Sequence, residues 1–309
     1  MAKSFISQKK YILSALGCLL IIIGLVYYFF FSALSVKSST QYVYIDDDDN
    51  IDSVYVKVKE ISTDRGYMAF TTLARHWDLA EKIRPGRYEV TTDNGAFTVF
   101  RKLKNGLQSP VNLTIPSVRT LDKLADEVSK KLMFSKDDFL KAVSDTATCR
   151  KYGYTPESIA AMFIPNTYSV YWNISVDKFL DKMQKENKKF WSFERENKAK
   201  AMGLSPIEVI TMASIVDEET ANDQEKPMIA GMYYNRLKGD MPLQADPTVK
   251  FALKKFELKR IYHNMLSFDS PYNTYKYKGL PPGPIRIPSV AGIDAVLNYV
   301  HHDYLYMCA

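Results

Sequence analysis

The hydrophobic pattern of the chain predicts one buried helix over residues 205–220. Ser205, Pro206 and Glu208 are typical of a helix start: serine caps the first turn, proline suits the first helical position, and a glutamate three residues after the cap completes a capping box. The residues that follow are apolar on nearly every side, which is the pattern of a helix inside a core. The helix nevertheless ends in three consecutive acids, Asp217, Glu218 and Glu219.

A second long apolar segment lies near the N-terminus. Residues 11–36 carry no charge and are long enough to cross a bilayer. Lysines precede this segment and aspartates follow it. The positive-inside rule therefore predicts a cytoplasmic tail over residues 1–10, a transmembrane helix over 11–36 and an extracytoplasmic remainder anchored in the cytoplasmic (inner) membrane. A cleaved signal peptide ending near residues 32–35 and a lipid-modified Cys18 are the alternatives.

Short strands and helices alternate after the membrane segment. This pattern predicts a compact α+β module over residues 40–150. The acidic run at 46–49 could hold calcium, although acids at the start of a helix explain it better. The module shows no catalytic constellation, which favours a role in binding or packing. Its expected strands are 41–45, 86–90 and 111–115, and its expected helices are 51–61, 68–79, 96–104, 120–132 and 135–143.

Residues 151–309 are predicted to form a second domain of helices and strands around the buried helix. Asp246 and Pro247 have the spacing of a helix cap and its first turn. The whole chain is therefore expected to be α+β, with a transmembrane helix, a small module and a mixed helical and strand domain. Besides the helix at 205–220, the pattern predicts helices at 176–199, from Pro227 to Leu237, after Asp246 and at 289–300, and a last strand at 304–307.

Composition narrows the range of partners and cofactors. Lysine and arginine total 41 against 35 acids, and the net charge of +6 is mild, so no nucleic acid is expected. Three cysteines and four histidines lack the spacing of a zinc site, and neither a metal nor a cofactor is predicted. Cys18 lies in the membrane segment, whereas Cys149 and Cys308 would meet an oxidising compartment and could form a disulfide.

Polar side chains interrupt apolar or rigid segments after residue 200, and these are the candidates for chemistry. They are carboxylates, amides and hydroxyl-bearing residues, which are the side chains that hold and cleave sugars. No nucleophilic serine motif or phosphate-binding glycine loop accompanies them. The candidates are Glu218, Glu219, Asn235, Gln244, Asp246, Tyr272, Asn273 and Thr274.

Helical spacing distinguishes the acids at the end of the buried helix. Glu219 follows Ile215 on the apolar face, whereas Glu218 follows Ser214 on a more polar line. Burial and the negative end of a helix both raise the pKa of a carboxyl. Because a carboxyl that is protonated near neutral pH can donate a proton to a glycosidic oxygen, Glu219 is the candidate catalytic acid. The alternative is that all three acids only solvate the helix end.

Five segments of the second domain carry a likeness to a known family. They are 213–220 (ASIVDEET), 235–237 (NRL), 241–249 (MPLQADPTV), 272–275 (YNTY) and 279–285 (GLPPGPI), in this order. Together they resemble the YceG-like (MltG) family of endolytic murein transglycosylases. A looser likeness extends upstream through 164–168 and 85–88, and the single anchor followed by a small LysM-like module also resembles this family.

The resemblance implies an enzyme that cuts the β-1,4 bond between N-acetylmuramic acid and N-acetylglucosamine within peptidoglycan strands and leaves 1,6-anhydro-N-acetylmuramic acid ends. The catalytic acid of the family falls on Glu219, whereas Asp217 replaces the usual glutamate at the first acidic position. Glu219 would protonate the leaving oxygen and then, as a carboxylate, accept the proton of the sugar's C6 hydroxyl. The candidates for holding the sugars are Gln244, Asp246, Tyr272, Asn273 and Thr274, and the candidates for supporting residues are Asp217, Glu218 and Asn235.

Several alternatives stay open at this point. The candidate binding residues could instead hold loops together through hydrogen bonds. Members of the family continue beyond a strand like that at 304–307, so the likeness implies a truncated C-terminal end. A non-catalytic peptidoglycan-binding or division-scaffold protein is a second reading, and a glycoside hydrolase with Glu219 and Asp246 as paired carboxylates is a third. Peptidoglycan strands and peptidoglycan synthases are the expected partners.

Overall fold

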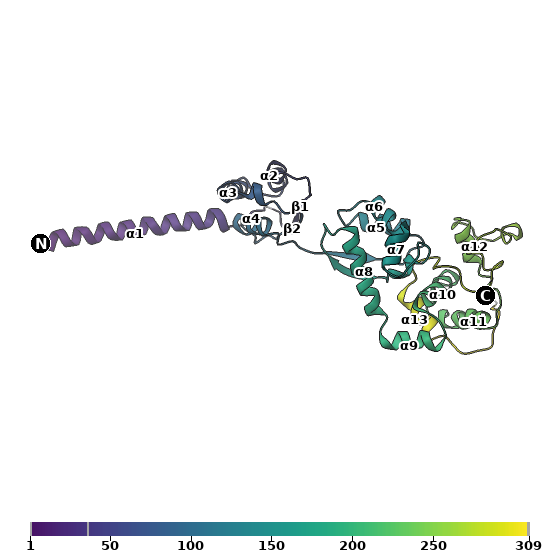
Figure 1. The fold of residues 1–309 in the computed structure, drawn as a ribbon. Coiled ribbons are helices and arrows are strands. Elements are labelled where there is room, and N and C mark those ends of the chain that lie inside the picture. The colour runs from purple at the N-terminus through teal and green to yellow at the C-terminus, as the bar shows by residue number, and fades with distance from the viewer. Residues whose placement is uncertain (1, 36, 308–309) are drawn as a thin grey trace. The chain divides into compact units, whose positions relative to one another are not determined.

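The computed structural model describes residues 2–35 and 37–307, with side chains from residue 11 onward (Figure 1). It divides into two compact units. The first unit comprises Met1–Val111 with Val170–Asn173, and the second comprises Asn112–Ser169 with Ile174–Ala309. Helices and short strands are mixed along the chain, which confirms the α+β class.

A two-stranded sheet and three helices enclose the core of the first unit. The strands pair antiparallel, with Gln41 opposite Val90 and Ile45 opposite Gly86. Alternate strand residues are buried, as their apolar and polar alternation predicts, and Tyr88 is fully enclosed. The elements are β1 (Gln41–Ile45), α2 (Ile51–Lys59), α3 (Asp64–His76), the 3-10 helix η1 (Leu79–Lys82), β2 (Gly86–Val90) and α4 (Ala96–Asn105).

The N-terminal helix α1 (Ala2–Phe31) begins and ends earlier than the predicted span. Its apolar part, Tyr11–Phe31, contains 21 residues with a mean hydropathy of 2.5, and it is long enough to cross a membrane by length and composition. Part of the predicted tail at 1–10 is helical as well. Residues 32–35 leave the helix, because Leu34 enters the core of the first unit and exchanges backbone hydrogen bonds with Asn94 and Thr63.

The second unit begins earlier than the predicted boundary at residue 150. Strand β3 (Val111–Ile115) pairs with β4 (Asn166–Val170), and the helices between them pack with the rest of this unit. The residues assigned from sequence to the end of the module thus belong with the later part of the chain. These helices are α5 (Leu121–Ser129), α6 (Lys136–Ser144), α7 (Thr146–Lys151) and the 3-10 helix η2 (Ile159–Met162).

The long helix predicted at 176–199 is interrupted. The structure has α8 (Val176–Phe190) and then α9 (Phe193–Ala201), with a bend between them. Ser192 caps the new helix by accepting a hydrogen bond from the backbone amide of Arg195, which is the local signal that favours a fresh start. Trp191 at the break is buried.

The buried helix predicted at 205–220 is confirmed as α10 (Pro206–Glu219). Ser205 accepts a hydrogen bond from the Glu208 amide, and the Glu208 side chain returns to the Ser205 amide, so the capping box is complete. The body from Val209 to Asp217 is buried. Helices α9, α11 (Lys226–Lys238), α12 (Asp246–Ala252) and α13 (Val290–Leu297) pack around it (Figure 1).

Two predictions near the end of the chain are wrong. Ala245 stands at the N-cap of α12 and Asp246 is its first helical residue, so Asp246 does not cap the helix. Within the described residues, 304–307 form irregular backbone and no strand. The carbonyls of Tyr304 and Leu305 accept hydrogen bonds from the side chains of Asn235 and Arg236, which takes the place of strand pairing.

Candidate active site

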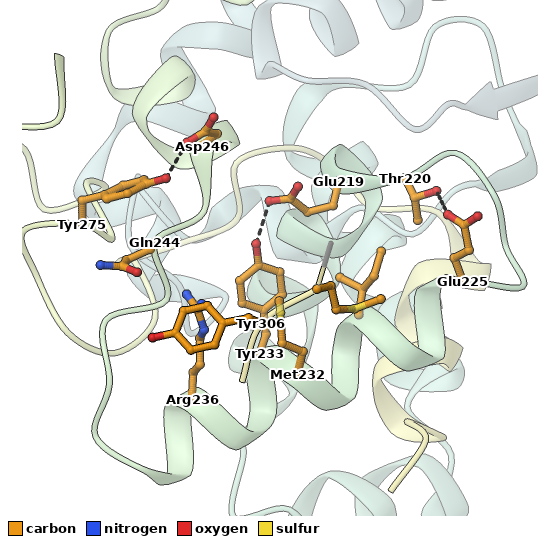
Figure 2. Close-up of a pocket in the computed structure, with 12 residues that line it drawn as sticks. Glu219, Thr220, Glu225, Met232, Tyr233, Arg236, Gln244, Asp246, Tyr275 and Tyr306 are labelled. Carbon is orange, nitrogen blue, oxygen red and sulfur yellow. Dashed lines mark hydrogen bonds between the residues drawn. The ribbon is translucent and has the colours of Figure 1, made fainter. Parts of the chain in front are cut away.

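A cleft of about 580 Å³ opens at the C-terminal end of α10 (Figure 2). The end of α10 forms one side of it, α11 forms the floor, and the turn into α12 with the loop around Tyr275 forms the opposite side. The lining residues are Glu219, Thr220, Glu225, Ile229, Met232, Tyr233, Arg236, Gln244, Asp246, Tyr275, Tyr306 and Met307.

Glu219 is the last residue of α10, and its carboxyl group is open to the cleft. The hydroxyl of Tyr233, from the middle of α11, donates a hydrogen bond of 2.6 Å to Oε1 of Glu219 (Figure 2). Tyr233 itself is 3% exposed, so its ring is fixed by the core and its hydroxyl holds the carboxyl in one orientation. The sequence predicted Glu219 on the apolar face of a buried helix, and the structure places it at the edge of that core.

The surroundings of Glu219 favour the protonated carboxyl. Loss of water around the group is the largest influence and raises its pKa above the usual glutamate value. The nearby charges of Asp246 and Glu218 raise the pKa further, whereas the hydrogen bond from Tyr233 and the charge of Lys250 lower it. The net direction is upward, which is the direction that the sequence predicts for the pKa of Glu219.

Tyr233 remains a hydrogen-bond donor while the Glu219 carboxyl gains or loses its proton. Burial raises the pKa of its phenol well above the usual value, and the adjacent Glu219 raises it further. The phenol therefore stays protonated and donates to Oε1. A proton carried by the Glu219 carboxyl then belongs on the other oxygen, Oε2.

Asp246 lies across the same cleft. The hydroxyl of Tyr275 donates a hydrogen bond of 2.6 Å to its Oδ1, in the same way that Tyr233 holds Glu219 (Figure 2). Burial raises the pKa of Tyr275, and so does its hydrogen bond to Asp246, so this phenol is a stable donor as well. Gln244 lies close by with an exposed side chain, on a backbone that has the left-handed φ of 50°.

The neighbouring acids Asp217 and Glu218 are paired with cations. Asp217 and Lys226 form a buried ion pair at 2.8 Å, and Asp217 also accepts from the backbone amide of Ser289 at the start of α13. Glu218 lies between Arg119 at 2.8 Å and Arg286 at 3.0 Å. Both acids thus join α10 to its neighbours. The charge of Glu218 is one of the smaller influences that raise the pKa of Glu219.

Asn273 and Thr274 are buried and serve the loop. The amide of Asn273 donates to the carbonyls of Leu266 and Phe268, and its residue is 0% exposed. The hydroxyl of Thr274 accepts from the Ala245 amide. These hydrogen bonds position the wall that carries Gln244 and Tyr275, and they favour the alternative in which these two residues hold the loop together.

Tyr272 and Asn235 lie outside the lining of the cleft. Tyr272 borders a separate hollow of about 360 Å³ together with Phe251, whose ring centroid is 4.8 Å from its own. Asn235 donates from its side chain to the carbonyls of His302 and Tyr304 and so holds the C-terminal segment against α11.

Sequence reasoning missed Tyr233, Arg236 and Tyr275 as site residues. Tyr233 lies on the apolar side of its helix and belongs to the core. Arg236 is buried, donates to the carbonyls of Leu243 and Leu305, and lies under the ring of Tyr306. In the sequence, Tyr233 and Arg236 are visible only as an aromatic and a cation on an apolar helix. Their contacts become known only when the helices are packed.

The described residues show no group of three or more histidine, cysteine, aspartate or glutamate side chains that could hold a metal ion. Cys149 is buried and its thiol contacts the carbonyl of Val143. The pairing with Cys308 that the sequence leaves open involves a residue outside the described part of the chain.

Comparison with known proteins decides the family. The sequence profile of the YceG-like family matches residues 43–309. The chain belongs to the YceG-like family. A solved YceG-like protein from Listeria monocytogenes has a similar fold, with a TM-score of 0.57 and 27% identity over 88% of this chain and 94% of that one.

Two relatives of this YceG-like chain are named endolytic murein transglycosylases. The one from Streptococcus pneumoniae is 28% identical over 295 residues, which cover 86% of this chain and 53% of the relative. The one from Bacillus subtilis is 44% identical over 106 residues, 34% of this chain and 29% of the relative. The YceG-like chain thus spans about half the length of its streptococcal relative, and its 106-residue match covers less than a third of the Bacillus one.

Proposed function

We propose that the protein is a membrane-anchored lytic transglycosylase that cuts the β-1,4 bond between N-acetylmuramic acid and N-acetylglucosamine within peptidoglycan strands and leaves 1,6-anhydro ends. The observation that carries this proposal is the Glu219 carboxyl, which opens into the cleft, has a raised pKa and is oriented by Tyr233. The names of the streptococcal and Bacillus relatives support the same class of substrate.

The chemistry needs one carboxyl that acts twice. Glu219 gives the proton on Oε2 to the glycosidic oxygen as the bond to the anomeric carbon breaks. The C6 hydroxyl of the same N-acetylmuramic acid then forms a bond to that carbon and releases its proton to the Glu219 carboxylate. The enzyme ends with Glu219 protonated again, and water takes no part.

The hydrogen bond from Tyr233 fits both halves of this cycle. It leaves Oε2 free to face the sugar, and it stabilises the carboxylate after the proton has gone. Positive charge develops at the anomeric carbon while the bond breaks. The Asp246 carboxylate, held by Tyr275, can stabilise this charge from the other side of the cleft. Gln244 is the candidate for hydrogen bonds to the sugar, because its amide is exposed to the cleft.

A two-carboxylate glycoside hydrolase is the second candidate function. It is favoured by one observation, the presence of both Glu219 and Asp246 in the same cleft. In that case Asp246 would activate a water molecule or attack the sugar, and the product would have a reducing end. A non-catalytic glycan-binding protein would yield neither product.

Digestion of purified peptidoglycan, followed by mass spectrometry, tests the proposal. We expect new 1,6-anhydro ends with the full-length chain and none with Glu219→Gln, which should still bind the glycan. Glu208→Gln is the matched control, because it changes an acid at the opposite end of the same helix and glutamine also completes a capping box. Equal activity of Glu219→Gln and the parent chain would overturn the assignment of Glu219.

The setting of the enzyme follows from the N-terminal part of the chain. We infer that Tyr11–Phe31 anchors it in the cytoplasmic membrane with the N-terminus inside, because lysines precede the apolar segment and acids follow it. The strand, helix, helix, strand order of β1, α2, α3 and β2 supports a LysM-like module that binds glycan. Peptidoglycan synthases acting on the same strands are the proposed partners.

A further inference from the structure

The first unit is fastened to the end of α1 by Arg65. This residue, in the first turn of α3, donates from Nη1 to the carbonyls of Tyr28 at 3.3 Å and Phe29 at 3.1 Å, and from Nη2 to that of Ala33 at 2.7 Å. Its guanidinium also lies 5.0 Å from the centre of the Tyr28 ring. The last carbonyls of a helix lack partners within the helix. Arg65 therefore caps α1 and joins it directly to α3.

The other end of α3 lies close to the end of α1 as well. Trp77 follows the last residue of α3, and its ring centroid is 6.3 Å from that of Phe97 on α4. Phe97 in turn lies 5.2 Å from Phe31, the last residue of α1. A helix of 13 residues is about 20 Å long. Because both of its ends lie near the same end of α1, α3 crosses that end and does not continue its direction.

We propose that the face of the first unit around the end of α1, formed by Arg65, Trp77 and Phe97, rests on the lipid headgroups of the membrane that α1 enters. The apolar stretch Tyr11–Phe31 is about 31 Å long as a helix, close to the roughly 30 Å of a bilayer's hydrocarbon core. Phe31 then lies at the boundary between acyl chains and headgroups. Phe97, Trp77 and the start of α3 must lie at the same depth. This inference rests on the membrane anchoring proposed above.

The side chains on this face suit such a boundary. Trp77 is 47% exposed, and tryptophan is favoured at the headgroup level because its ring is apolar and its N–H is polar. Met68, one turn after Arg65, is also exposed. Lys104 lies over the Trp77 ring, and Arg75 is exposed in the last turn of α3. The partner is therefore a lipid surface that offers phosphate groups, and anionic lipids should strengthen the contact.

The contact would fix the height of the first unit above the membrane. Arg65, Leu34 and the Phe31–Phe97 pair leave little freedom between the anchor and this unit. The first unit is then held against the bilayer surface and is not connected to the membrane by a flexible linker.

Quenching of tryptophan fluorescence by brominated lipids tests the proposal. The full-length chain is placed in nanodiscs that contain phosphatidylglycerol and phosphatidylcholine brominated near the headgroup end of the acyl chain. Trp172 provides the control because it lies far from the end of α1. Its ring packs on Tyr44, near one end of the sheet, whereas the chain that leaves α1 bridges from Ala33 to Gly95, beyond the other end. We expect Trp77→Phe to lose most of the emission that lipid quenches and Trp172→Phe to keep it. Equal quenching of Trp77→Phe and the parent chain would overturn the proposal.

A second pair of variants adds a reporter and leaves Trp77 in place. Met68→Trp should add emission that brominated lipid quenches, whereas Tyr44→Trp, at an exposed position near Trp172, should add emission that it does not. Equal quenching of the two added signals would also overturn the proposal. Flotation of the full-length chain with liposomes tests the anchor separately. Failure to float would refute both the membrane anchor and the headgroup contact. Flotation without quenching at Trp77 or Met68→Trp would refute the headgroup contact alone.

Discussion

The hydroxyl of Tyr233 lies 2.6 Å from Oε1 of Glu219 and donates a hydrogen bond to it. One residue comes from the centre of α11, and the other ends α10. The contact sets both the orientation of the carboxyl and the balance between its two protonation states. It connects the packing of two core helices to the chemistry proposed for the cleft.

Tyr233→Phe should move the pH dependence of the reaction upward. The hydrogen bond lowers the pKa of Glu219 against the larger effect of lost water, so its removal raises that pKa. The alkaline limb of kcat/KM, which reports loss of the acid's proton, should shift to higher pH. Activity at neutral pH should fall roughly 10- to 100-fold, because the carboxyl is no longer held in place. An unchanged profile would mean that this hydrogen bond has no part in the reaction.

Asp246→Asn should move the same limb in the opposite direction. The negative charge of Asp246 raises the pKa of Glu219, and asparagine removes that charge. Tyr275→Phe is the matched variant, since it removes the hydrogen bond to Asp246 and keeps the charge. The products of Asp246→Asn should still carry anhydro ends. Complete loss of turnover in this variant, with reducing ends in the products of the parent chain, would favour the two-carboxylate hydrolase.

Glu219→Gln should be more stable than the parent chain at neutral pH. The pKa of Glu219 is raised in the folded state. Its contribution to the free energy of unfolding is therefore fully present below the unfolded-state pKa of about 4.3, and it is lost as pH rises through the folded-state pKa. Glutamine removes this titration and can still accept from Tyr233. The difference in unfolding free energy, measured by urea denaturation, should grow from acid to neutral pH. A constant difference across that range would contradict the raised pKa.

Asp217→Ala should destabilise the second unit. Asp217 and Lys226 form an ion pair in which both side chains are buried. Removal of Asp217 takes away the buried counterion of Lys226 and leaves it paired with the exposed Asp223 at 2.6 Å. The expected loss is about 3 kcal/mol. Glu127→Ala, which breaks an exposed pair with Lys130 in the same unit, should cost below about 1 kcal/mol. Denaturation of both variants checks the contrast, and similar losses would show that burial does not govern these pairs.

Local signals in the sequence were enough for the framework of the site. The capping box and the apolar body of α10 predicted its limits, and helical spacing singled out Glu219. The strand alternation at 86–90 and 111–115 was equally local and is confirmed. The sequence does not reveal the break between α8 and α9, because Ser192 caps a new helix within a segment rich in lysine and glutamate, which favour a helix on both sides of it.

Contacts between distant segments were beyond the reach of the sequence. Tyr233 looks like a core residue from its spacing, and only the packing of α11 against α10 brings its hydroxyl to Glu219. Asn273 has the same polarity whether it holds a sugar or a loop, and only its burial in the folded chain favours the loop. Asp246 has the spacing of a cap, but Ala245 occupies the N-cap position. The Asp246 carboxylate instead accepts a hydrogen bond from the hydroxyl of Tyr275.

The most direct test of the central claim is digestion of peptidoglycan by the full-length chain in water enriched in oxygen-18, with the new glycan ends analysed by mass spectrometry. If Glu219 protonates the leaving oxygen and the C6 hydroxyl attacks the anomeric carbon, the new ends are 1,6-anhydro-N-acetylmuramic acid and contain no heavy oxygen. New reducing ends that carry oxygen-18 would contradict the account, because they would show that water, and not the sugar's own hydroxyl, completes the reaction.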